Sequence, residues 1–174
     1  MKQQSKTIQK KAFIGILCSV ILIFLDQFTK YLAVQHLKDQ MPVVLWKNVL
    51  ELSYLENRGA AFGIFQGKQW PLIIFTVIVL IFIIYFYLMR IPSVKHSGLL
   101  NGIAILFFAG AIGNFIDRVT QRYVVDFFYF RLINFPVFNV ADIYVTVAAV
   151  LLILCLLFYK EEDFERILPT KKKS

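Results

Sequence analysis

Four long apolar segments constrain the fold of this chain more than any other feature of its sequence. They cover approximately residues 12–34, 70–89, 98–116 and 140–159. A helix of about 20 predominantly apolar residues is long enough to cross the hydrocarbon core of a bilayer. Hydrophobic residues make up 59% of the chain, whereas about 45–50% is usual in a soluble domain. We therefore expect one integral membrane domain, residues 1–174, with four transmembrane helices.

Lysines before the first apolar segment also suggest an alternative, a cleavable signal peptide. The apolar run is too long for the usual core of such a peptide, and no small-x-small cleavage motif follows it. The stretch that follows Leu25 is polar and keeps helical spacing. We therefore expect the first segment to remain as a membrane helix.

The distribution of Lys and Arg predicts how the helices are oriented in the membrane. The two ends of the chain and the loop at 90–97 together carry 11 of these residues in about 34 positions. The loops at 35–69 and 117–139 carry 7 in about 58 positions. Because basic residues concentrate in cytoplasmic segments, we expect both termini in the cytoplasm and the two longer loops outside.

The first of these longer loops has the composition of β-strands. Residues 43–55 mix β-branched and aromatic side chains with partial alternation. The stretch 124–138 is similar, and it either pairs with the first stretch or forms an amphipathic interfacial piece. The expected fold is therefore a membrane all-α bundle of four transmembrane helices with a small extracytoplasmic β-sheet.

Two aspartates occupy positions where a charge is costly. Asp126 interrupts an apolar run, and Asp142 opens the fourth apolar segment. An ionisable residue beside a membrane suggests a functional site. Taken alone, Asp142 is explained better as the third residue of a helix capped by Asn139. Asp126 has only Arg122 and Arg131 as nearby countercharges, and two carboxylates together could share a proton and activate a water.

Further polar residues fall near the expected outer ends of the helices. Asp26 and Lys30 are four residues apart and can form an ion pair. The pair could join two helices, or it could belong to the site. A third possibility is that Lys30 extends to the outer lipid headgroups instead. Asn114, Asp117 and Arg118 share one face if the third helix continues through them. Arg118 is then most simply the ion-pair partner of a carboxylate, and the alternative is that this face borders the site.

The segment 57–63 closes the first outer loop. Its small residues permit close approach of the backbone to a partner or ligand, and Asn57 and Arg58 add an amide and a fixed positive charge. A plain turn before the second helix would also use Asn and Gly, so both interpretations stay open.

Other chemistries find no support in the sequence. Cys18 and Cys155 lie in apolar segments and are expected to pack, and His36 and His96 are expected in solvated loops. No spacing suggests a metal site, and the motifs of zinc peptidases and serine hydrolases are absent from the sequence. Basic residues flank the apolar segments rather than forming a patch for nucleic acid. Carboxylate chemistry is the simplest remaining option.

Five motifs occur in order along the chain and together resemble the bacterial lipoprotein signal peptidase (signal peptidase II) family. Each motif is short, but the set covers the chain from the first expected helix to the fourth. The motifs are Asp26-Gln-Phe-Thr-Lys30, Asn57-Arg-Gly-Ala-Ala-Phe-Gly63, Gly113-Asn-Phe-Ile-Asp-Arg118, Val124-Val-Asp126-Phe and Phe138-Asn-Val-Ala-Asp142.

This resemblance implies an aspartic endopeptidase of the bacterial inner or plasma membrane, with Asp126 and Asp142 as its catalytic pair. The family cleaves diacylglyceryl-modified prolipoproteins on the N-terminal side of the lipidated cysteine, with no metal or other cofactor. The implied fold has four helices, an outer β-cradle and an outer-surface loop, with the site at the extracytoplasmic interface. We expect a monomer in contact with membrane lipid. The implied supporting residues are Asp26, Lys30, Asn57, Arg58, Asn114, Arg118 and Asn139.

Two alternatives belong to other classes of protein. A small transporter or proton-relay protein would also place acids in a membrane, but it predicts acids near the midplane, interrupted helices and a repeat. The acids here cluster toward one interface and the sequence shows no repeat. A scaffold protein would use its polar residues only to join helices, so Asp126→Asn would alter assembly and leave any activity intact.

Overall fold

The computed structural model describes residues 2–60, 65–91 and 97–158. Its helices are α1 (Lys2–Leu37), α2 (Gln69–Tyr85), α3 (Ser97–Thr120) and α4 (Val140–Phe158), and a π-helical turn, η2 (Phe86–Arg90), continues α2. Four helices are long and apolar enough to cross a membrane, as the sequence predicts. The observed first and third helices extend past the expected ends, to Leu37 and Thr120.

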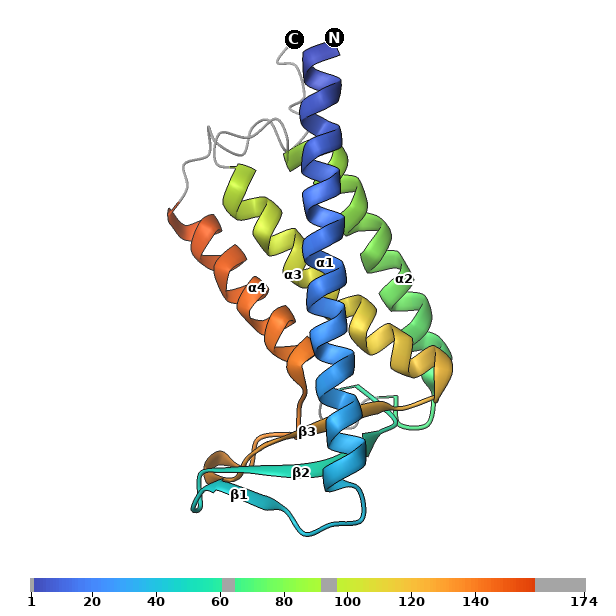
Figure 1. Cartoon of the computed structure of the whole chain (residues 1–174), viewed down its shortest axis with the longest axis vertical. Coiled ribbons are helices and arrows are strands. Elements are labelled where there is room, and N and C mark those ends of the chain that lie inside the picture. Colours follow the sequence, from blue (N-terminus) through green and yellow to red (C-terminus); the bar gives the residue numbers. More distant parts are fainter. Residues whose placement is uncertain (1, 61–64, 92–96, 159–174) are drawn as a thin grey trace.

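The four helices form a bundle that carries the sheet at one end (Figure 1). The long helix α1 runs down the bundle to the sheet, and α3 packs against α1, α2 and α4. The start of α1 and the end of α4 lie at the opposite end of the bundle (Figure 1). Polar residues near the C-terminal ends of α1 and α3 therefore meet the start of α4 beside the sheet.

The sheet has three antiparallel strands in the order β1 (Val43–Trp46), β2 (Leu50–Asn57) and β3 (Val124–Phe130). The two strand-like stretches of the sequence therefore pair directly, which decides between the two possibilities left open above. In this register Leu55 lies opposite Asp126. The pairing places the end of β2 next to the aspartate of β3.

After β3 the chain folds back toward the bundle before α4 begins. A short 3-10 turn, η4 (Arg131–Ile133), leads into Asn134, whose backbone is left-handed at φ 48°. Phe138 then returns beside Phe128, with backbone hydrogen bonds of 2.8 and 3.0 Å between them. This return delivers Asn139 and the start of α4 to the position next to β3.

Glycines on α3 let α4 and α1 approach closely. A Cβ added at Gly110 would lie 2.6 Å from the backbone oxygen of Ala141, and one at Gly113 would overlap the carboxylate of Asp26. Small residues commonly permit such close packing between membrane helices. The contacts at Gly110 and Gly113 bring three helices together at the level of the polar residues.

The predictions for the histidines and cysteines are confirmed only in part. The loop position predicted for His36 is wrong, because α1 continues through it to Leu37, although the side chain is exposed. His96 lies outside the described residues. Cys155 is buried in an apolar cluster, as a packing residue should be, whereas Cys18 is only half-buried, and both are free thiols.

Candidate active site

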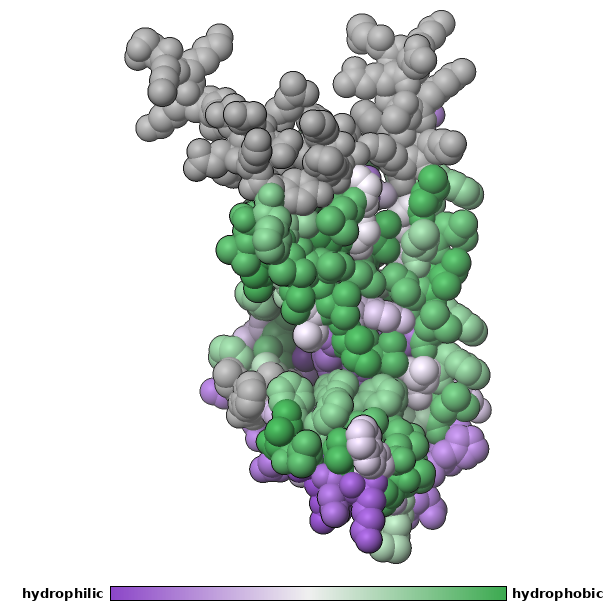
Figure 2. All heavy atoms as spheres, turned by 90° about the vertical axis from the view of Figure 1, so that its left-hand side faces the viewer, coloured by the Kyte–Doolittle hydropathy of each residue, from purple (hydrophilic) through white to green (hydrophobic). Residues whose placement is uncertain are grey.

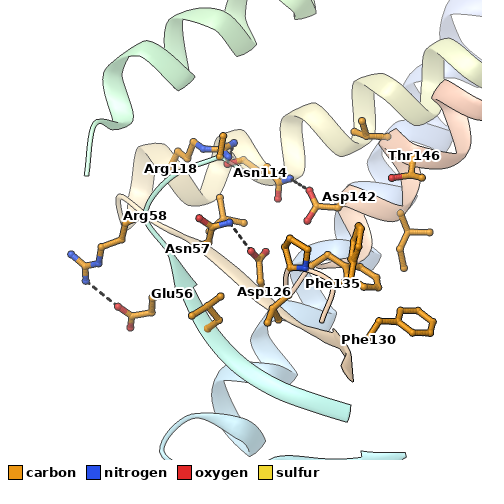
Figure 3. A pocket seen from close by; sticks show the side chains of 18 of the residues that line it. Glu56, Asn57, Arg58, Asn114, Arg118, Asp126, Phe130, Phe135, Asp142 and Thr146 are labelled. Atoms are coloured by element: carbon orange, nitrogen blue, oxygen red, sulfur yellow. Dashed lines mark hydrogen bonds and ion pairs between the residues drawn. The ribbon is translucent and has the colours of Figure 1, made fainter. Parts of the chain in front are cut away.

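Asp126 and Asp142 line one cavity of ≈ 750 Å³ at the junction of the sheet and the bundle (Figure 3). Asp126 lies on β3, and Asp142 lies in the first turn of α4. The space-filling view shows a recess at this level, with hydrophilic residues behind it and hydrophobic residues above and below (Figure 2). The fold thus brings the two aspartates to a shared, accessible space.

Asp142 caps its own helix and also faces the cavity. Its backbone N–H donates to Asn139 Oδ1 at 3.0 Å, and Asn139 N–H donates to Asp142 Oδ2 at 3.1 Å. This reciprocal pattern is a capping box, so the capping interpretation of the sequence is confirmed. The other oxygen, Oδ1, accepts a hydrogen bond from Asn114 Nδ2 at 2.8 Å. Capping occupies one carboxylate oxygen and leaves the second within the polar network of the site.

Asp126 is held by two amides rather than by a positive charge. Asn139 Nδ2 donates to Oδ1 at 2.6 Å, and Asn57 Nδ2 donates to Oδ2 at 2.8 Å. The expectation that Arg131 is a countercharge is wrong, because Arg131 pairs with Glu51 at 2.7 Å. Burial, and then the charge of Asp142, raise the pKa of Asp126 to about 7, although both amide hydrogen bonds act in the opposite direction. Asp126 can therefore carry a proton near neutral pH.

Asn114 connects the two aspartates through a continuous amide network. Its Nδ2 donates to Asp142, while its Oδ1 accepts from Asn139 Nδ2 at 3.1 Å and from Lys30 Nζ at 2.9 Å. Asn139 in turn donates to Asp126. The side-chain amides of Asn57, Asn114 and Asn139 thus hold both carboxylates by hydrogen bonds, with no cation between them.

A buried charge cluster lies behind this network. Lys30 Nζ is 2.9 Å from Asp26 Oδ2 and 3.0 Å from Asp117 Oδ2, and all three side chains are at most 5% exposed. The ion-pair interpretation of Asp26 and Lys30 is confirmed, and the pair joins α1 to α3 through Asp117. The alternative in which Lys30 extends to lipid headgroups is wrong, because its side chain is buried.

Sequence reasoning missed two members of this cluster. Gln27 Nε2 donates to Asp117 Oδ1 at 3.0 Å, to the Gly113 carbonyl at 3.1 Å and to Asp26 Oδ2 at 3.2 Å. From the sequence, Asp117 is one of three residues on a helix face shared with Asn114 and Arg118, with no link to Lys30. The adjacency of Gln27 to Asp26 and the i+3 spacing from Asn114 to Asp117 were the available signals.

The two arginines occupy different parts of the site. Arg58 pairs with Glu56 at 3.0 Å, lies over the ring of Tyr123 and is 59% exposed, so it stands at the mouth of the cavity (Figure 3). The prediction that Arg118 forms an ion pair with a carboxylate is wrong. Among the described residues Arg118 has no such pair, and Asp117 pairs with Lys30 instead. Arg118 lines the cavity, and its buried Nε has no hydrogen-bond partner there.

The cavity has a polar end and an apolar end. Asn57, Asn114 and Arg118 surround the aspartates, whereas residues from the return after β3 and from α4 form the opposite wall. That wall contains Ile133, Phe135, Pro136, Val137, Ile143 and Val147. A ligand that fills the cavity must therefore be polar in one part and apolar in another.

The described part of the chain contains no cluster of side chains that could bind a metal ion. Among residues 2–60, 65–91 and 97–158, no three His, Cys, Asp or Glu side chains are placed to hold a metal ion. The arrangement that these residues do form is a pair of carboxylates, oriented by neutral amides and open to one cavity.

A bundle of four membrane-length helices, with a buried and a half-buried carboxylate beside one amphipathic cavity, fits the class of membrane-embedded aspartic hydrolases. A family model described as signal peptidase (SPase) II matches residues 18–158. The chain therefore belongs to the signal peptidase II family, and it is a peptidase. The family match does not support the transporter alternative.

Curated relatives and solved structures agree with this assignment. Lipoprotein signal peptidases of Streptococcus pyogenes serotypes M5 (strain Manfredo) and M18 (strain MGAS8232) are each 40% identical over 152 residues, covering 86% of this chain and 95% of the relative. Two solved structures described as a bacterial membrane enzyme are also similar. One has a TM-score of 0.74 at 34% identity, covering 91% of this chain and 94% of that chain. The other has a TM-score of 0.72 at 35% identity, covering 84% and 94%.

Proposed function

We propose that this protein removes signal peptides from diacylglyceryl-modified prolipoproteins, with Asp126 and Asp142 as its catalytic pair. The observation that carries the proposal is the convergence of these two carboxylates on one cavity in a member of the signal peptidase II family. They come from β3 and from α4, and three asparagine side chains hold them in place.

Peptide hydrolysis by this pair needs one ionised and one protonated carboxylate. Asp142 lies at the positive N-terminal end of α4 and suits the base that takes a proton from a water. That water attacks the scissile carbonyl carbon, while the proton on Asp126 polarises the carbonyl oxygen. When the C–N bond breaks, a proton passes to the leaving amine of the cysteine, and the signal peptide keeps the new carboxylate.

The surrounding residues orient this chemistry. Asn57, Asn114 and Asn139 hold the carboxylates by donated hydrogen bonds. Arg118 lines the cavity beside Asn114, so its guanidinium is suited to bind a substrate carbonyl. Arg58 stands at the mouth, where its exposed guanidinium can contact the arriving peptide.

The two-ended cavity fits a lipid-modified peptide in one orientation. The scissile bond lies at the polar end beside the aspartates, and the diacylglyceryl group extends along the apolar wall. The acyl chains then exchange membrane lipid for apolar side chains, so they remain in apolar surroundings throughout binding. This end of the cavity is bordered by α4 and by the return after β3, so we expect the lipid anchor to lie beside the membrane.

We further propose the placement of this single peptidase domain in a bacterial inner or plasma membrane. Both termini face the cytoplasm and the sheet lies at the outer surface, because Lys and Arg are denser in the two terminal segments and the 90–97 loop than in the two longer loops. Exposed apolar side chains on and beside the sheet, including Met41, Trp46 and Leu132, suit contact with membrane lipid. A monomer is sufficient for the proposed chemistry, because one chain supplies both aspartates and the three asparagines that hold them.

The direct test is a cleavage assay with purified wild-type protein in detergent or lipid. A diacylglyceryl-prolipoprotein is compared with the same peptide lacking the lipid, each with and without EDTA. We expect cleavage N-terminal to the lipidated cysteine, little cleavage of the unlipidated peptide and no effect of EDTA. Equal cleavage of both substrates would contradict the lipid-recognition part, and no cleavage of either would contradict the proposed function.

The pH dependence of the reaction follows from the raised pKa of Asp126. Below a pH of about 7 the Asp126 carboxyl keeps its proton, and above that pH it ionises. Since the mechanism needs one proton on the pair, kcat/KM is expected to fall about tenfold per pH unit on the alkaline side. The measurement is a pH profile of kcat/KM with the folded fraction recorded at each pH. A flat profile far above neutrality would contradict this role of Asp126.

A further inference from the structure

Lys30 lies at the meeting point of three polar contacts, each of which leads toward a catalytic aspartate. Its ammonium group is 2.9 Å from Asp26 Oδ2, 3.0 Å from Asp117 Oδ2 and 2.9 Å from Asn114 Oδ1. A lysine ammonium has three donors, and these three acceptors match them. Lys30 is 3% exposed and is not among the residues that line the cavity.

The two acids beside Lys30 hold the backbone immediately before each catalytic residue. Asp26 Oδ1 accepts the N–H of Ala141 at 2.9 Å, and Ala141 precedes Asp142. Asp117 Oδ2 accepts the N–H of Val125 at 3.2 Å, and Val125 precedes Asp126. The start of α4 and the start of β3 are therefore tied to acids that pair with the same lysine.

The third contact sets the orientation of an amide. Because Lys30 donates to Asn114 Oδ1, Asn114 Nδ2 is directed toward Asp142 Oδ1 at 2.8 Å. A flipped amide would face its N–H groups toward the lysine ammonium and its oxygen toward the carboxylate. Both contacts of that alternative are repulsive, so Lys30 selects the orientation that serves the site.

We propose that Lys30 is a positioning residue that sets the relative placement of the two catalytic aspartates, beyond its role in joining α1 to α3. The inference rests on the proposed catalytic pair. Lys30 acts through Ala141, Val125 and Asn114, and it does not contact the substrate.

The test separates positioning from simple charge compensation. Lys30→Met leaves two buried acids without their cation, so it is expected to lower the melting temperature. Adding Asp117→Asn removes one of those charges and should restore much of the stability. We expect kcat per folded enzyme to stay about 10²-fold below that of Asp117→Asn alone, with KM changed by less than about twofold, since the cavity is intact. A kcat equal to that of Asp117→Asn once stability returns would overturn the proposal.

If the double variant fails to fold, a second variant, Lys30→Gln, still tests the positioning role. Lys30→Gln provides a neutral donor that can still reach an acceptor, so its kcat per folded enzyme should exceed that of Lys30→Met. Equal values for the two variants would also overturn the proposal. The matched control is Lys38→Met, which removes an exposed lysine and should leave kcat unchanged. Asp126→Asn or Asp142→Asn with normal activity would instead reject the catalytic pair, whatever the Lys30 variants show.

Discussion

Replacing either Asp126 or Asp142 with asparagine is expected to abolish signal-peptide cleavage, while the protein still inserts and folds. Asparagine has nearly the same size as aspartate but can neither accept nor release a proton under these conditions. Because a positioned acid or base contributes about 10²–10⁴-fold to a rate, we expect kcat to fall at least about 10³-fold in each variant. The two losses should not add in the double variant, since the carboxylates act as one unit.

Folding must be measured beside activity, because each new amide disturbs the network. At position 126 the carboxylate accepts from both Asn57 and Asn139, and an amide would direct a donor at one of these donors. Such a mismatch costs about 1–3 kcal/mol. The control is Asp39→Asn, at an exposed left-handed position (φ 58°) that asparagine also adopts readily. Full processing of a diacylglyceryl-prolipoprotein by either folded variant would contradict the catalytic assignment.

Replacing Asp26 with alanine is expected to cause the largest loss of stability among single changes near the site. Asp26 is fully buried, pairs with Lys30 at 2.9 Å and accepts the N–H of Ala141 at 2.9 Å. Removing one partner of a buried ion pair costs about 3–5 kcal/mol, because the other charge loses compensation. The expected loss is measured by thermal or denaturant unfolding in detergent, with cleavage normalised to folded protein.

Two variants separate the causes of that loss. Asp26→Asn keeps an oxygen that can accept from Ala141 while removing the charge, so it should lose less stability than Asp26→Ala. Lys38→Met breaks an ion pair with Glu56 at 3.3 Å whose side chains are 41% and 27% exposed, and such pairs contribute about 0–1 kcal/mol. If Asp26→Ala were no more destabilising than Lys38→Met, the buried cluster would not stabilise the fold.

Features that depend on local chain properties could be predicted from the sequence. The number of spanning helices follows from the length of the apolar segments, and the capping box of α4 follows from the three-residue spacing of Asn139 and Asp142. Strand character at 43–55 and 124–138 was also evident, because β-branched and aromatic side chains dominate those stretches. The motif resemblance then correctly indicated the family.

Partner choice among charged residues could not be predicted in the same way. Arg118 follows Asp117 in the chain, yet Asp117 pairs with Lys30, which is 87 positions away. Gln27 carried no periodic signal, although it contacts two acids of the buried cluster. The loop position of His36 was wrong because α1 continues to Leu37, and the packing of Leu37 with Val125 and Phe127 of β3 could not be predicted from the sequence.

The sequence alone was enough to predict the membrane class, the four spans, the capped start of α4 and the two aspartates that we propose as catalytic. These follow from short-range properties, namely apolar length and residue spacing. Three further features required the three-dimensional fold. Asp126 and Asp142 share a cavity, three asparagines hold them, and Lys30 lies behind both. These contacts join positions far apart in the chain. The glycines of α3 let the helices pack closely, and the polar groups buried there are stabilised by hydrogen bonds and ion pairs with one another.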